Sequence, residues 1–160
     1  MFTGAQITAA FVDLGITHVV WLPDSTLGTW DAAIEQCPAL SLVRVCREGE
    51  AWLIAAGLYL GGKQPIVVMQ TTGMFESGDA MRNALFDLRL PLYAIIGHRS
   101  YLLPHSTDSA RRFAEPVLAA WGIDTQLLAS PDELDRFAQH YRACIQAGRP
   151  GVTLLAEGKG

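Results

Sequence analysis

The fold is decided by the stretch Val45-Cys-Arg-Glu-Gly-Glu-Ala-Trp-Leu-Ile-Ala-Ala-Gly-Leu-Tyr59, which joins a predicted strand to a predicted helix. The apolar run that ends at Val45 gives way to Arg47-Glu48, and the chain then turns at once into an apolar helix. Glu48 therefore stands at a helix N-terminus, where the macrodipole favours the anionic carboxylate and a ligand or partner can reach it. The helix carries small residues that predict close packing: Ala51, Ala55, Ala56 and Gly57.

Strand-like and helix-like runs alternate along the whole chain, which is typical of a parallel sheet with helices on both faces. We therefore predict a single α/β domain over residues 1–160, with a doubly wound, mainly parallel six-stranded sheet. Pro116 predicts a kink or break in the helix that begins at Asp108. The predicted strands are His18–Leu22, Leu40–Cys46, Ile66–Gln70, Pro91–Ile96, Thr125–Leu128 and Gly151–Leu155.

Unusual polar residues gather in the segments that follow the predicted strands. In parallel α/β sheets, ligands bind beyond the carboxyl ends of the strands. We therefore expect the functional site at that edge of the sheet. The four segments expected to form loops there are Pro23–Ser25, Arg47–Glu48, Gln70–Ser77 and Gly97–His105.

Composition narrows the class of protein. Half of the residues are hydrophobic, 18% are charged and the net charge is −4, with no basic run to neutralise a nucleic-acid backbone. No apolar run approaches the ~20 residues that span a bilayer, so we expect a cytoplasmic protein without membrane association. The three cysteines lack the spacing of a disulfide framework or a zinc site. The apolar composition predicts burial against another chain.

Residue chemistry alone favours structural roles for most of these groups. On that basis Glu48, Glu76 and Asp79 are interpreted as helix-start carboxylates, and Asp24-Ser25 as a turn and cap. Cys46 is predicted to be a buried structural thiol. His105 is predicted to be exposed, and Arg111-Arg112 to form a solvated helix face. The sequence contains no dinucleotide fingerprint, Walker phosphate loop or nucleophile elbow, and the histidines show no metal-ligand spacing.

A resemblance adds a functional interpretation. Arg47-Glu48-Gly-Glu-Ala51, then Ala55-Ala56-Gly57, then Gly62-Lys-Gln-Pro65 and the strand ending Thr72-Gly73 resemble the pyrimidine-binding (Pyr) domain of thiamine diphosphate enzymes. Three further segments resemble the sulfopyruvate and phosphonopyruvate decarboxylase branch of that family. They are Val20–Ser25, Glu76–Asn83 and Leu90–Gly97, so the resemblance covers nearly the whole chain.

The resemblance implies a role for Glu48 as the glutamate that activates the cofactor. In the family, this glutamate hydrogen-bonds ring nitrogen N1′ of the aminopyrimidine. It thereby favours the imino tautomer, which takes a proton from the thiazolium ring. The activated cofactor then attacks a 2-oxoacid, which loses carbon dioxide. Glu50 departs from the neutral residue that is commoner in the family and is not predicted to be catalytic.

The resemblance also implies binding residues in the neighbouring loops. Thr72 and Gly73 match the segment beside the pyrimidine of the cofactor, although Met74–Gly78 departs from the Gly-x-Gly-Asn of many relatives. Asp24 and Ser25 match a turn that borders the substrate. From charge and position we add a hypothesis that cationic side chains bind the anionic tail of a sulfonated or phosphonated substrate. The side chains in that hypothesis are His98, Arg99 and His105.

The family's second domain has no counterpart in the sequence. That domain holds the cofactor diphosphate through Mg²⁺ on a Gly-Asp-Gly motif, whereas Gly78-Asp79 here continues with Ala-Met. The resemblance therefore implies an α subunit with no metal ligand of its own. A β subunit would supply the diphosphate domain, in a hetero-oligomer such as a dimer of αβ pairs. Two alternatives stay open: a carboligase resembling acetolactate synthase, and a non-catalytic regulatory or nucleotide-binding module.

Overall fold

Six parallel strands form one sheet in the computed structural model, which describes residues 1–158. Their order across the sheet is β2-β1-β3-β4-β6-β5, and each neighbouring pair is parallel. This arrangement confirms the predicted doubly wound α/β fold and the number of strands. The strands are β1 (His18–Trp21), β2 (Ser41–Arg44), β3 (Pro65–Gln70), β4 (Tyr93–His98), β5 (Asp124–Leu128) and β6 (Gly151–Ala156).

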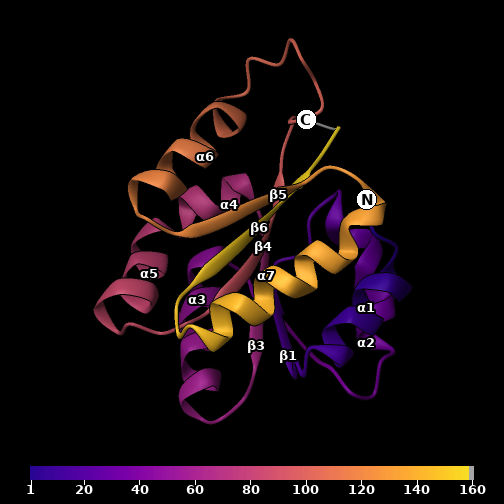
Figure 1. Ribbon diagram of the computed structural model, residues 1–160, viewed down its shortest axis with the longest axis vertical. Helices are drawn as coiled ribbons and strands as arrows, with labels where there is room; N and C mark the ends of the chain where they lie inside the picture. Colours follow the sequence, from indigo (N-terminus) through magenta and orange to yellow (C-terminus); the bar gives the residue numbers. More distant parts are fainter. Residues whose placement is uncertain (159–160) are drawn as a thin grey trace.

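Helices cover both faces of the sheet, as Figure 1 shows. One face carries α3 (Glu48–Leu60), α4 (Thr71–Glu76), α5 (Gly78–Arg82) with the π-helical turn Asn83–Asp87, and α6 (Ser109–Ala120). The other face carries α1 (Gly4–Asp13), the 3-10 helix Leu27–Trp30 with α2 (Asp31–Glu35), and α7 (Leu134–Gln146). A short 3-10 turn, Pro131–Glu133, precedes α7.

The core consists of two apolar layers, one on each side of the sheet. Alternate residues of the central strands contribute side chains to the two layers, because successive side chains of a strand point to opposite faces. Val67 and Met69 of β3 pack under α3, whereas Ile66 and Val68 pack under α1 and α7. The central strands are therefore buried on both faces, which accounts for their continuous apolar runs.

Two predicted local features are wrong. The segment Gln70–Ser77, expected to form a loop, is mostly helical, because α4 begins at Thr71 directly after β3. Burial of Gly73, Met74 and Ser77 at helical spacing stabilises that turn despite the poor helix propensity of Thr and Gly. A kink or break was predicted at Pro116, and the break is absent, since α6 runs through that proline to Ala120.

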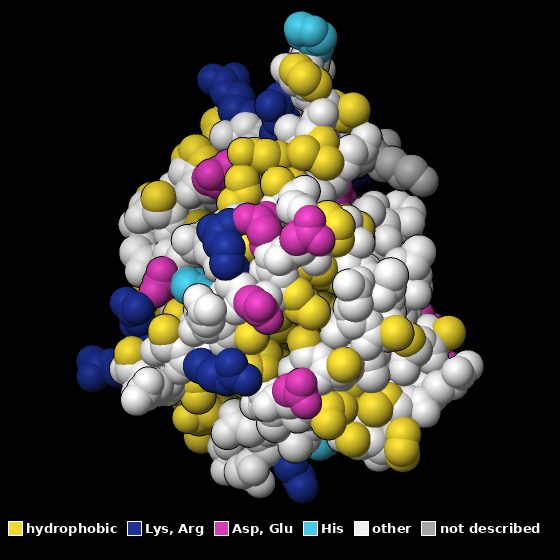
Figure 2. All heavy atoms as spheres, turned by 45° about the vertical axis from the view of Figure 1, so that its right-hand side comes forward, with side chains coloured by type: hydrophobic (Ala, Val, Ile, Leu, Met, Phe, Trp, Pro, Cys, Tyr) yellow, Lys and Arg dark blue, Asp and Glu magenta, His cyan; other side chains and the backbone are white. Residues whose placement is uncertain are grey.

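The predicted site edge lies beyond the carboxyl ends of the strands. The segment before α3 follows β2 there, α4 follows β3, and a long loop of residues 99–108 joins β4 to α6 and projects at the top of Figure 1. Within residues 1–158, none of the helices combines the length and apolar character that crossing a bilayer requires. Acidic and basic side chains are interspersed on the face in Figure 2, without a continuous basic surface.

Candidate active site

Three carboxylates surround the N-terminus of α3. Arg47 has the extended backbone of a cap residue, and Glu48 is the first residue of the helix. Glu50 Oε2 accepts hydrogen bonds from the backbone N–H groups of Cys46 and Arg47, at 3.0 and 3.2 Å. Glu50 thus caps the helix, in keeping with the expectation that it is not catalytic.

Glu76 reaches the same helix end from α4. Its Oε1 pairs with Arg47 Nη2 at 2.5 Å, and its Oε2 accepts from the backbone N–H of Gly49 at 3.0 Å. The Arg47 guanidinium and the Gly49 N–H lower the pKa of the Glu76 carboxyl. Glu76 therefore ends α4 and caps α3, whereas the sequence predicted that it would open the following helix.

Glu48 is the carboxylate that these caps leave without a partner. Among residues 1–158, no hydrogen bond or ion pair involves its side chain, which is half-buried. The side chain lies against the first turn of α4. A Cβ placed on Gly73 would lie 2.5 Å from both Cγ and Oε1 of Glu48. Only glycine at position 73 leaves the carboxylate where it is.

Buried contacts fix α3 against α4. Trp52 Nε1 donates a hydrogen bond of 3.0 Å to Ser77 Oγ, and Ser77 Oγ in turn donates to the Met74 carbonyl at 3.2 Å. Trp52 is completely buried, so the register between the two helices is set one turn away from Glu48. Thr71 is buried with an unpartnered Oγ1, while Thr72 is exposed and donates to Gln70 Oε1 at 3.3 Å.

The loop after β1 has a structural role that its residues predicted. Asp24 Oδ1 accepts from the backbone N–H groups of Thr26 and Leu27, both at 2.8 Å. Its second oxygen, Oδ2, is buried and has no partner within the described residues. Ser25 is exposed. The turn interpretation is therefore confirmed, whereas the cap residue of the 3-10 helix Leu27–Trp30 is Thr26.

The three cations predicted to bind a substrate tail lie in different environments. His98 is completely buried, with Nε2 3.2 Å from Glu115 Oε1, and burial lowers the pKa of its imidazole. Arg99 Nε lies 3.1 Å from Asp108 Oδ2. His105 is exposed, as predicted, in the loop that follows. A fully buried imidazole cannot contact an anion at the surface, so His98 is poorly placed for that role.

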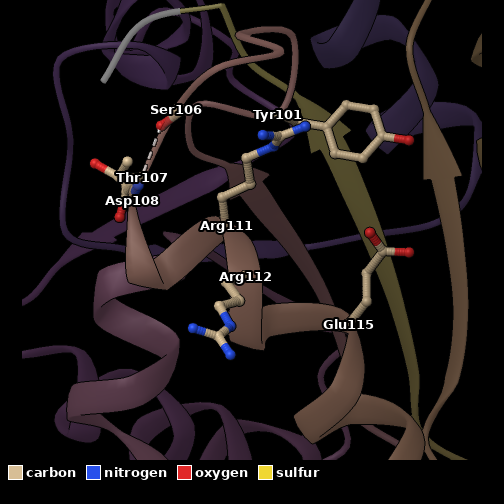
Figure 3. Close-up of a pocket in the computed structure, with 7 residues that line it drawn as sticks. All are labelled: Tyr101, Ser106, Thr107, Asp108, Arg111, Arg112 and Glu115. Carbon is tan, nitrogen blue, oxygen red and sulfur yellow. Dashed lines mark hydrogen bonds between the residues drawn. The ribbon is translucent and has the colours of Figure 1, made fainter.

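A pocket of about 520 Å³ opens between this loop and α6. In Figure 3 the side chain of Arg111 extends towards Tyr101, with Glu115 lying below that ring. Arg111 has a single weak bond, from Nη1 to the Pro104 carbonyl at 3.5 Å, whereas Arg112 stacks on Phe113 at 5.1 Å. The sequence placed both arginines on a solvated face. The spacing of Asp108, Arg111 and Glu115 on one helix face could have indicated the pocket.

Two further residues differ from the sequence interpretation. Glu157 follows β6 and is 2% exposed, with Oε1 unpartnered and lying where a Cβ on Gly97 would be. Burial, together with the charge of Asp24, raises the pKa of Glu157 to about 7. Nothing in the residues around Glu157 indicated this burial. Cys46 was predicted to be a buried thiol and is exposed, because it lies past the end of β2 in the connection to α3.

These observations define a parallel α/β domain with an unpartnered glutamate at the carboxyl edge of its sheet. No family model matches the chain. The chain is 27% identical to phosphonopyruvate decarboxylase of Streptomyces viridochromogenes over 90% of its own length and 36% of that protein. It is 29% identical to sulfopyruvate decarboxylase subunit alpha of Methanocaldococcus jannaschii, over 82% of this chain and 81% of that subunit.

A third relative is the corresponding subunit of Methanothermobacter thermautotrophicus, which is 30% identical over 58% of this chain and 56% of that subunit. The chain thus spans about a third of the phosphonopyruvate decarboxylase and most of the M. jannaschii alpha subunit. The resemblance inferred from the motifs to these two kinds of decarboxylase is confirmed. The names of the relatives that match in length refer to one subunit of an assembly.

Proposed function

We propose that this chain is the Pyr subunit of a thiamine diphosphate-dependent 2-oxoacid decarboxylase of the sulfopyruvate or phosphonopyruvate type. In this proposal residues 1–160 form the Pyr domain, and a β subunit supplies the domain that holds the diphosphate and Mg²⁺. The observation that carries the proposal is the state of Glu48. Its neighbours Glu50 and Glu76 are bound to main-chain N–H groups, whereas Glu48 is half-buried and unpaired among the described residues.

The residues at this edge fit the pyrimidine half of the cofactor. An aminopyrimidine offers a ring nitrogen that can share a proton with the unpartnered Glu48 carboxylate. A poorly solvated pocket strengthens such a hydrogen bond. Gly73 keeps the carboxylate in position, since any side chain there would displace it. Exposed Thr72 borders the same turn of α4, so we propose Thr72 and Gly73 as further cofactor contacts.

Thiamine diphosphate, when bound, supplies a thiazolium ring that takes up the electrons released as a 2-oxoacid loses carbon dioxide. The part of this chain is to hold and move one proton at the Glu48 carboxylate. Arg47 does not compete for that carboxylate, because its guanidinium is bound to Glu76 at 2.5 and 3.0 Å. The pair formed by Arg47 and Glu76 thereby leaves Glu48 free for the ring nitrogen.

We place the anionic tail of the substrate in the pocket beside α6. α4 packs against α6, so this pocket lies one helix away from the turn that holds Gly73. Arg111 keeps guanidinium N–H groups free for a sulfonate or phosphonate, and Arg99 lies at the end of β4 nearby. We propose that Asp24, Ser25 and His105 border the route to this pocket, while His98 supports it from within through Glu115.

The test is the substitution Glu48→Gln in the complex co-expressed with its partner. The amide cannot hold the transferable proton, so turnover should fall about 100-fold or more, as expected for loss of a general acid–base group. Carbon dioxide release from sulfopyruvate and phosphonopyruvate measures the effect.

The matched control is Glu50→Gln, two residues away. Its amide oxygen can still accept from Cys46 and Arg47, so turnover and assembly should remain close to those of the unmodified complex. Turnover of the Glu48→Gln complex within a few-fold of the unmodified complex would contradict the proposed role.

A further inference from the structure

Three side chains with metal-ligating atoms converge at the opposite edge of the sheet. Asp124 is the first residue of β5, and His140 and Cys144 belong to α7. All three ligating atoms lie within 4.8 Å of one another. Asp124 Oδ1 is 3.2 Å from His140 Nε2, while Cys144 Sγ is 3.8 Å from His140 Nε2 and 3.8 Å from Asp124 Oδ2.

The helix and the strand together produce this convergence. Residues four apart lie on one face of a helix, so His140 and Cys144 point the same way from α7. That face of α7 packs on β4, β5 and β6, as Figure 1 shows, which brings the start of β5 beneath it. Neither the spacing among the histidines nor the spacing among the cysteines indicates a site to which one residue of each kind contributes.

The separations suit a tetrahedral ion. Bonds of about 2.0–2.2 Å to nitrogen and oxygen and about 2.3 Å to sulfur place the ligand atoms around tetrahedral zinc about 3.3–3.6 Å apart. The observed distances of 3.2 and 3.8 Å bracket that range. Two of the three pairs thus lie close to the spacing of zinc ligands, and all the ligating atoms lie within 4.8 Å of one another.

Outer contacts hold the three ligands in place. Tyr93 Oη lies 2.5 Å from His140 Nδ1 and 2.7 Å from Thr153 Oγ1, which leaves Nε2 directed at the cluster. Arg149 Nη2 binds Asp124 Oδ2 at 2.7 Å, leaving Oδ1 for an ion. A Cβ on Gly151 would lie 2.6 Å from Cys144 Sγ, so the glycine makes room for the sulfur. Such outer partners orient ligands in metal sites.

We propose that Asp124, His140 and Cys144 form a binding site for a zinc-class divalent cation, with three protein ligands and a fourth position open to water. Thiolate and imidazole ligands select zinc over Mg²⁺ or Ca²⁺. Cys144 is fully buried, whereas the side chains of His140 and Asp124 are 15% and 30% exposed, so the open position faces solvent. The site lies at the amino edge of the sheet and does not depend on the proposed decarboxylase function.

The test uses cobalt as a spectroscopic probe of the full chain, without a histidine tag and under reducing conditions. Cobalt(II) should bind at a single saturable site and produce a near-ultraviolet thiolate-to-cobalt band with the visible bands of tetrahedral cobalt. Added zinc should abolish both. The band should disappear in Cys144→Ser and in Asp124→Asn, and Tyr93→Phe should weaken binding about 10-fold or more.

Controls separate this site from other thiols and from loss of the fold. Cys46→Ser removes an exposed thiol elsewhere and should leave the band unchanged. Asp124 is partly exposed, so Asp124→Asn should retain the circular dichroism spectrum of the unmodified chain while losing the band. Absence of saturable cobalt or zinc binding, or a thiolate band that persists in Cys144→Ser, would overturn the proposal.

Discussion

At the scale of single residues, the hydrogen bonds at the start of α3 distinguish carboxylates that stabilise the fold from one that remains free for chemistry. Glu50 and Glu76 each receive backbone N–H groups that a helix leaves unsatisfied in its first turn. Their charges are therefore committed to the fold. Glu48 lies among them without such a bond. It packs so closely on Gly73 that there is no room for a side chain at position 73. A residue whose charge contributes nothing visible to the fold is the natural candidate for chemistry.

Arg111 gives a prediction about the choice of substrate. If its guanidinium receives the anionic tail, Arg111→Gln should raise KM for sulfopyruvate or phosphonopyruvate about 10-fold or more, as expected for loss of a charge-assisted hydrogen bond. KM for pyruvate, which lacks the tail, should not change. Steady-state kinetics on the three substrates measures the split.

Arg142→Gln is the matched control for this prediction, because Arg142 is exposed on α7, which covers the other face of the sheet. It should leave all three KM values unchanged. An equal rise in KM for pyruvate and for the sulfonated substrate in Arg111→Gln would remove the specificity role.

Glu157 gives a prediction about pH. Its pKa is raised from 4.5 to about 7, chiefly by burial, so the folded state binds its proton more tightly than the unfolded state does. Below about pH 4.5 the Glu157 carboxyl is neutral in both the folded and the unfolded chain, so its burial costs no stability there. Stability is lost as the pH rises from there to about 7, by at most about 3 kcal/mol. Glu157→Gln should relieve this loss and stabilise the chain at pH 8 but not at pH 4.5.

Urea unfolding of the chain at the two pH values measures the effect of Glu157→Gln. Asp135→Asn is the control, because Asp135 is exposed on α7 and its side chain makes no hydrogen bond or ion pair within the described residues. A Glu157→Gln variant that gains the same stability at both pH values would show that the carboxyl group titrates normally in the folded chain.

At the scale of elements, hydrophobic patterns predicted the strands, because an apolar run is a property of neighbouring residues. Each strand was predicted in order, because buried strands are continuous apolar runs. The helix at Thr71 was missed because packing of Met74 and Ser77 overrides the propensity of the segment. Local patterns contain no information about such contacts.

In the candidate site, too, features set by neighbouring residues could be predicted, and features set by residues far apart in the chain could not. The position of Glu48 at a helix start follows from its neighbours in sequence, whereas the role proposed for it rests on a resemblance to known enzymes. The partners of His98 and Arg99 lie 17 and 9 residues away, on or before α6, and their pairing could not be predicted. Glu157 and the cluster at Cys144 depend on which strands become neighbours, so they appear only in the folded chain.

At the scale of the whole molecule, the outward face of α3 is unlike a solvated helix. Leu53, Ile54 and Leu60 are 54%, 37% and 69% exposed, and Gly57 lies among them at helical spacing. A Cβ on Gly57 would meet no atom within 4 Å, so the close packing predicted for this glycine does not occur within the chain. An apolar face of this kind, beginning one turn from Glu48, suits burial by a partner subunit.

Gly57→Leu tests whether this face binds the proposed β subunit. Replacing glycine within a helix should stabilise the chain alone by about 0.5–1 kcal/mol, because glycine loses more conformational freedom on folding. The added side chain should nevertheless prevent close approach of the partner. Gln139→Leu, on the exposed side of α7, is the matched control for an added leucine and should leave assembly intact.

Calorimetric titration with thiamine diphosphate and Mg²⁺ links this interface to function. If the cofactor lies between two subunits, the complex should bind it, and neither the chain alone nor the Gly57→Leu mixture should do so. Product analysis on the active complex then distinguishes aldehyde release from carboligation. Tight binding by the chain alone would contradict the split site and favour a nucleotide-binding module. Full assembly and cofactor binding by Gly57→Leu would instead place the partner on another face, with the role of Glu48 still to be judged by its own substitution.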